Sequence, residues 1–158
     1  MNILDRPAGL LPGGVTARHP LAEQQRGLWY LQQLAPHCGA YHLLFSAEAR
    51  LPTGFDPAFL GEALSSMCAA HDVLRTSLAA EDGEPWQWVH AEVSPDIRLV
   101  DAVGLDDDAL RERARADSRV PFDLSMPPLW RVHLYHRGDD RVLAMLVAHH
   151  ALLDFWSL

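Results

Sequence analysis

The sequence predicts a mixed α/β sandwich, and two observations support this fold class. Strand and helix signals follow one another in the order strand, helix, hairpin, strand, helix, hairpin. Residues 142–148 are all apolar, which is typical of a central strand that is covered on both faces. The length of 158 residues is enough for one core of ordinary size, so we expect one domain or part of a larger one.

The first third of the chain predicts one helix and one strand. Residues 1–20 are rich in proline and glycine and indicate a leader, a linker or a docking tail. Apolar residues then recur at helical spacing from Leu21 to Leu34, with Gln25 at one of these positions. Residues 41–51 begin with alternating apolar positions and predict a strand.

The second helix has the clearest boundaries. Asp56 is a good N-cap, Pro57 fits the first helical position, and apolar residues recur at steps of three and four as far as Leu74. An acidic turn then separates residues 75–80 from residues 86–90, which predicts a hairpin.

The remaining segments complete the sandwich. Residues 97–100 are a short strand candidate, and residues 106–119 predict a polar helix with acids first and arginines later, as the helix dipole favours. Residues 129–136 and 142–148 predict two strands joined by the turn at residues 138–140.

Composition and charge exclude several classes of function. The chain has 13 basic residues, all arginine, against 21 acidic residues, and its net charge is −8. It has no basic run for nucleic acid or for an anionic membrane surface. Its apolar runs are far shorter than the roughly 20 residues that span a bilayer, and it lacks a secretory signal. Cys38 and Cys68 are too few for a disulfide framework or a zinc site, so we expect a cytoplasmic protein.

The end of the apolar strand carries the residues best suited to chemistry. His149 and His150 are adjacent, so on a strand their side chains point to opposite faces. They are therefore unsuited to holding one metal ion together, and we expect no metal site. Asp154 follows at a strand-to-loop transition, where a carboxylate can fix the backbone or pair with an arginine. The pattern alone leaves a catalytic and a structural histidine as equally good interpretations.

Four stretches, in order, resemble the motifs of condensation domains of nonribosomal peptide synthetases, which belong to the chloramphenicol-acetyltransferase-like superfamily. Residues 149–157 (HHALLDFWS) resemble the HHxxxDG motif. Residues 21–31 (LAEQQRGLWYL) resemble the first motif, and residues 70–78 (AHDVLRTSL) resemble the second, RHExLRTxF. Residues 121–132 are similar to the stretch that leads into the catalytic strand.

The resemblance implies a fold and a role for each motif residue. The fold is one lobe of a two-lobe domain: residues 21–158 correspond to the N-terminal lobe, and the C-terminal lobe is absent. His150 is implied at the acceptor amine, as a general base or as an orienting, oxyanion-stabilising group. His149 is implied as a supporting residue that points away. Asp154 is implied as structural, with Arg75 as its candidate partner.

The sequence departs from the family pattern after Asp154, where Phe155 replaces the usual glycine. One interpretation is a decayed site. The other is a subtype, because the Asp-Phe-Trp-Ser form resembles condensation domains of hybrid polyketide–peptide lines, whose donors are polyketide or fatty acyl chains. We favour the subtype because the rest of the motif is intact. Phe155, Trp156 and Ser157 are then expected to line the substrate tunnel.

The implied function is condensation. An acyl thioester on one acyl or peptidyl carrier protein is attacked by the amine, or less often the hydroxyl, of an acceptor on the next carrier. Both substrates arrive on phosphopantetheine arms, no cofactor is bound, and the isolated lobe is expected to have little activity. Two alternatives stay open: a tailoring acyltransferase of the same superfamily that uses coenzyme A or a carrier, and a non-catalytic lobe that only binds carriers.

Overall fold

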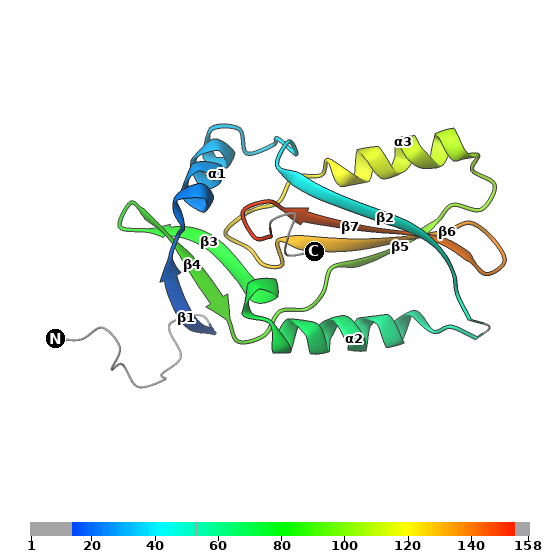
Figure 1. Cartoon of the computed structure of the whole chain (residues 1–158), viewed down its shortest axis with the longest axis horizontal. Coiled ribbons are helices and arrows are strands. Elements are labelled where there is room, and N and C mark those ends of the chain that lie inside the picture. Colours follow the sequence, from blue (N-terminus) through cyan, green and yellow to red (C-terminus); the bar gives the residue numbers. More distant parts are fainter. Residues whose placement is uncertain (1–13, 53, 154–158) are drawn as a thin grey trace.

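The strands form two sheets in the computed structural model, which describes residues 14–52 and 54–153 (Figure 1). The smaller sheet is antiparallel, with the order β1 (Val15–Pro20), β4 (Glu84–His90) and β3 (Thr76–Glu81). The larger sheet has the order β2 (His42–Arg50), β7 (Arg141–His149), β6 (Trp130–His136) and β5 (Ile97–Asp101). It is mixed, because β5 is parallel to β6 while the other pairs are antiparallel.

Two of the helices begin at a capping aspartate, and the predicted cap at Asp56 is confirmed. The Asp56 carboxylate accepts from the Ala58 amide at 2.8 Å and starts α2 (Pro57–Ala70). The Asp106 carboxylate accepts from the Ala109 amide at 2.8 Å and starts α3 (Asp107–Ser118). Helix α1 (Glu23–Leu34) lies beside the smaller sheet, while α2 and α3 lie on opposite sides of the larger one (Figure 1). None of these helices in the described part of the chain is long and apolar enough to cross a membrane.

Strand β7 is the centre of the larger sheet. It lies between β2 and β6, and it is buried on both faces: Met145 and Val147 point to one side, Val142 and Ala148 to the other. The prediction of a central, doubly covered strand is therefore confirmed. Figure 1 shows its end directed toward α1 and the smaller sheet.

Two boundary predictions are wrong. Residues 15–20 are strand β1 rather than leader or linker, since they pair with β4 and Val15 is buried. Their composition misleads because β1 is an edge strand, where a terminal proline such as Pro20 is tolerated. Helix α2 ends at Ala70 rather than continuing to Leu74, and the 3-10 helix η1 (Asp72–Arg75) follows it. Residues 1–13 lie outside the described residues.

Candidate functional site

The candidate site lies at the end of β7, where the paired strands stop. His42 of β2 is the register partner of His149, and the His150 amide donates to the Tyr41 carbonyl at 2.8 Å. His150 is therefore the first residue beyond the strand. It is still held to the segment before β2 by its backbone.

His150 has an exposed side chain with a defined orientation. Its Nδ1 lies 3.0 Å from the Leu153 carbonyl oxygen. Because a carbonyl oxygen only accepts hydrogen bonds, Nδ1 carries the proton and Nε2 carries a lone pair. An exposed imidazole in this tautomer can accept a proton from a bound amine through Nε2.

His149 has the opposite environment. Its side chain is 0% exposed, and its Nδ1 accepts a hydrogen bond of 3.1 Å from the Ala151 amide. Burial lowers the pKa of His149 to about 4, and the nearby His42 and His150 add to this effect. The His149 ring is thus fully buried and is neutral at pH 7, which suits a structural role.

The turn after β7 is held from two sides. The Leu152 amide donates to the His149 carbonyl at 2.9 Å, which closes the turn. From α1, the Gln25 side-chain amide donates to the Ala151 carbonyl at 2.9 Å, while its Oε1 accepts from the Ala22 amide at 3.0 Å. The first motif is thereby in direct contact with the loop that carries His150.

Gln25 is a residue of the candidate site whose contact with the turn is not evident from the sequence alone. The available signal was a polar residue at a position where the helical pattern expects an apolar one. Such a residue usually has a hydrogen-bond partner in the interior. Here that partner is the backbone carbonyl of Ala151.

Arg75 lies close to this end of the sheet. The Trp130 indole donates to the carbonyl of the neighbouring Leu74 at 2.9 Å, and Trp130 is the register partner of Ala148. The Arg75 side chain is 14% exposed and forms an ion pair with Asp72.

Arg75 has two further contacts, with the His90 carbonyl and, at 3.4 Å, with the Thr16 hydroxyl. Its expected partner Asp154 lies outside the described residues, as do the three expected tunnel residues Phe155, Trp156 and Ser157. The Arg75–Asp154 pair therefore stays a prediction.

Behind His149, a group of buried polar side chains lies on the α3 side of the sheet. Phe122 links them: the Arg131 guanidinium lies over its ring at 3.9 Å, and the His42 ring lies 4.9 Å away, centre to centre. Arg131 donates to the Pro121 carbonyl at 3.3 Å, and burial lowers its pKa. No local pattern in the sequence indicates this group, because it forms only when β2, β6 and β7 are in register.

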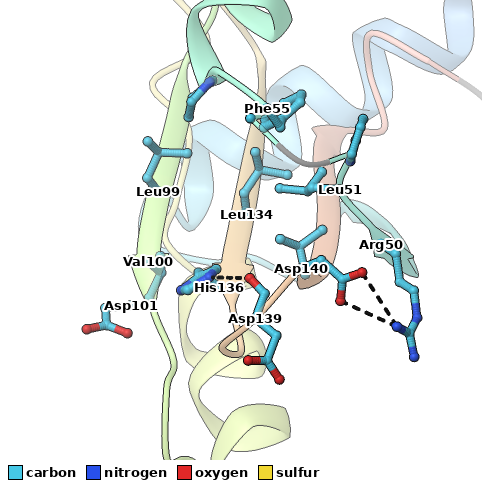
Figure 2. A pocket seen from close by; sticks show the side chains of 14 residues that line it. Arg50, Leu51, Phe55, Leu99, Val100, Asp101, Leu134, His136, Asp139 and Asp140 are labelled. Carbon is cyan, nitrogen blue, oxygen red and sulfur yellow. Dashed lines mark hydrogen bonds and ion pairs between the residues drawn. The ribbon is translucent and has the colours of Figure 1, made fainter.

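A cavity of about 1010 Å³ lies away from this site. It is at the other end of the larger sheet, between the start of α2 and the ends of β5 and β6 (Figure 2). Arg50 and Asp140, 3.5 Å apart, and His136 with the Asp139 carbonyl lie at its rim. Residues 14–52 and 54–153 contain no group of three or more His, Cys, Asp or Glu side chains placed to hold a metal ion.

A family model described as Condensation domain matches residues 15–158. The chain belongs to the condensation domain family. The match starts at Val15, the first residue of β1, and it corresponds to the N-terminal portion of a condensation domain. Condensation domains of nonribosomal peptide synthetases catalyse bond formation.

Two curated relatives of this condensation domain chain are large synthetases. The chain is 35% identical over 143 residues to phosphinothricin tripeptide synthetase PhsC of Streptomyces viridochromogenes, which covers 88% of the chain and 13% of the synthetase. It is 30% identical over 155 residues to enniatin synthase of Fusarium equiseti, covering 96% of the chain and 5% of the synthase. The chain thus spans a small part of the relatives it matches.

Solved structures show the same condensation-domain fold, which is chloramphenicol-acetyltransferase-like. A four-domain nonribosomal peptide synthetase bound to AMP and glycine matches with a TM-score of 0.86 and 34% identity, over 98% of this chain and 11% of that one. The first condensation domain of the calcium-dependent antibiotic synthetase, in complex with a substrate analogue, matches with a TM-score of 0.70 and 25% identity, over 86% of this chain and 34% of that one.

Proposed function

We propose that this chain is the N-terminal lobe of a condensation domain that joins a carrier-bound acyl thioester to a carrier-bound amine or hydroxyl. The orientation of His150 is the observation that carries this proposal. The side chain is exposed, and its hydrogen bond to the Leu153 carbonyl leaves a lone pair on Nε2. The nonribosomal peptide synthetases among the relatives support the reaction class.

The proposed reaction follows from that lone pair. The acceptor nitrogen attacks the thioester carbonyl carbon while Nε2 of His150 takes one N–H proton. A carbon–nitrogen bond forms, the carbon–sulfur bond breaks, and the proton passes to the departing thiolate. The products are an amide and a free thiol on the phosphopantetheine arm of the donor carrier.

The partners in this proposal are two carrier proteins and the C-terminal lobe of the same domain, which supplies the facing wall of the tunnel. The described cysteines, Cys38 and Cys68, are free thiols, which supports a cytoplasmic setting. A polyketide or fatty acyl donor is also part of the proposal, and it is based on the sequence around Phe155 alone.

The test is condensation by the whole protein that contains this chain, with an acyl-loaded donor carrier and an aminoacyl-loaded acceptor carrier. His150→Ala should lower the rate at least about a hundredfold. His136→Ala, an exposed histidine at the other end of the sheet, is the matched control and should retain the wild-type rate. Equal rates for both variants would contradict the proposal.

Two further outcomes would favour the alternative functions. Turnover of an acyl-coenzyme A without any carrier would favour a tailoring acyltransferase, and carrier binding without turnover would favour a non-catalytic lobe.

A further inference from the structure

Two histidine rings lie side by side beneath the loop that carries His150. His42 of β2 and His149 of β7 are register partners, and their ring centres are 5.9 Å apart with an angle of 70° between the rings. The Nε2 atoms of both rings are shielded from solvent, and neither has a hydrogen-bond partner within the described residues. Unsatisfied buried nitrogens of this kind are rare.

The tautomers of the two rings follow from their other nitrogens. His42 Nδ1 lies 2.7 Å from the Ser118 carbonyl oxygen, so Nδ1 holds the proton and Nε2 holds a lone pair. His149 Nδ1 accepts from the Ala151 amide, so His149 carries its proton on Nε2. The pair therefore contains one unused donor, on His149, and one unused acceptor, on His42.

We propose that His149 Nε2–H donates toward His42 Nε2, through one bridging water or after a small rotation of the rings, and that His42 is a positioning residue for His150. A ring separation of 5.9 Å is longer than a direct hydrogen bond of about 2.9 Å between the nitrogens would give, so the link needs either the bridging water or the rotation. This inference rests on the proposed function of His150.

The proposed link completes a series of three hydrogen bonds in which every donor points the same way. The Ala151 amide donates to His149, His149 donates toward His42, and His42 donates to the Ser118 carbonyl. Hydrogen bonds aligned in this way strengthen one another. Because Ala151 directly follows His150, these hydrogen bonds connect the end of α3 to the backbone beside the proposed general base.

A close backbone approach fixes the end of this hydrogen-bond series at Ser118. A Cβ atom at Gly39 would lie 2.8 Å from the Arg119 carbonyl oxygen, so the segment before β2 sits against the end of α3 with no room for a side chain. This contact holds Ser118 within reach of His42.

The surroundings keep both rings neutral. Burial lowers the pKa of His42, the hydrogen bond to Ser118 opposes this shift, and the positive charge of Arg131 on β6 adds to the lowering. His150, beyond β7, is the other titratable group that acts on His149, and the remaining ring close to the pair is Phe122. A proton added to His149 Nδ1 would displace the Ala151 amide, so acid should release the loop.

The first test reads the tautomers directly by nitrogen-15 NMR of the histidine rings in the 158-residue chain at pH 7. We expect His42 protonated at Nδ1, His149 protonated at Nε2, and both N–H protons slow to exchange with water. A charged ring, or the other tautomer on either residue, would overturn the proposal. This measurement needs no catalytic activity, so it stands apart from a failure of the proposed function.

The second test uses variants in the whole protein. His42→Phe keeps an aromatic ring but removes both nitrogens, and it should lower kcat about tenfold, the rate equivalent of one hydrogen bond. His42→Gln can donate to Ser118 and accept from the His149 side, and it should restore most of the rate. His90→Phe, at a half-buried histidine bonded to Ser77, is the control and should leave the His149 tautomer unchanged. An unchanged kcat in a folded His42→Phe protein would show that His42 does not position His150.

Discussion

The Gln25 side-chain amide donates a hydrogen bond of 2.9 Å to the Ala151 carbonyl, across 126 positions of the sequence. Because its Oε1 is occupied by the Ala22 amide, the orientation of the Gln25 amide group is fixed. Helix α1 is therefore bonded directly to the turn that follows β7 and carries His150.

We expect Gln25→Glu to lower kcat about tenfold, because a carboxylate cannot donate to the Ala151 carbonyl and repels it. The same variant keeps an acceptor for the Ala22 amide, so α1 should still form. Condensation rates at saturating substrate, together with the melting temperature, provide the measurement. Gln24→Ala, at the exposed neighbouring position, should match wild type. A folded Gln25→Glu protein with full kcat would show that α1 does not position the turn.

His149→Ala should act on stability first. It removes a fully buried ring and the acceptor of the Ala151 amide, and large-to-small changes of this kind cost about 2–4 kcal/mol. His150→Ala, at an exposed side chain, should change the free energy of unfolding by less than about 0.5 kcal/mol. Urea unfolding at pH 7 measures both. Equal stability losses in the two variants would contradict the division between a structural and a reactive histidine.

Acid should destabilise the fold through the buried histidines. The pKa of His149 is about 4 in the folded protein against 6.5 in an unfolded chain, so only the unfolded state binds a proton between these values. The contribution of His149 to the free energy of unfolding is complete above pH 6.5. It falls by about 3 kcal/mol toward pH 4 and then levels off. His42, His90 and His133 have lowered pKa values and act in the same direction.

Unfolding free energies at pH 7 and pH 5 provide the measurement. His149→Phe should have a lower stability at pH 7 but a smaller difference between the two pH values, since its side chain does not titrate. A His149→Phe protein with an undiminished pH dependence would assign the effect to other groups.

Asp56→Ala should destabilise the protein by about 1 kcal/mol, because the Ala58 amide at the start of α2 loses its side-chain partner. Asp108→Ala is the matched control. That aspartate is exposed, is not the N-cap residue of α3 and pairs with Arg111 on the helix surface, so its loss should change stability less than the loss of the Asp56 cap. Thermal unfolding of the two variants decides between a cap contribution and a general effect of removing a carboxylate.

Local signals in the sequence predicted much of the fold. The cap at Asp56, the acidic start of α3 and the apolar β7 are encoded by residues adjacent to one another, so they can be recognised without the fold. Strand β1 escaped recognition because an edge strand with one buried residue, Val15, carries almost no hydrophobic pattern. Its pairing with β4 is a tertiary contact that local composition does not express.

The site was predicted less completely. His149 and His150 were singled out because they end an apolar strand, which is a local feature. The contacts of Gln25 and His42 with this end of the sheet arise from register and packing between distant segments. A single sequence contains no signal for the register of β2 against β7, so the pairing of His42 with His149 required the structure.

The position of β7 has a consequence for how the protein is made. In the larger sheet β2 has β7 as its neighbour, yet β7 is the last strand along the described chain. During synthesis, β2 therefore stays unpaired until β7 leaves the ribosome. Unpaired strands are prone to aggregate at this stage. Its second half carries Ser46, Glu48 and Arg50, polar and charged side chains that oppose pairing with another nascent chain. The turn that carries His150 follows β7 directly and is bonded to the segment before β2, so it can take its folded shape only after β7 has paired with β2.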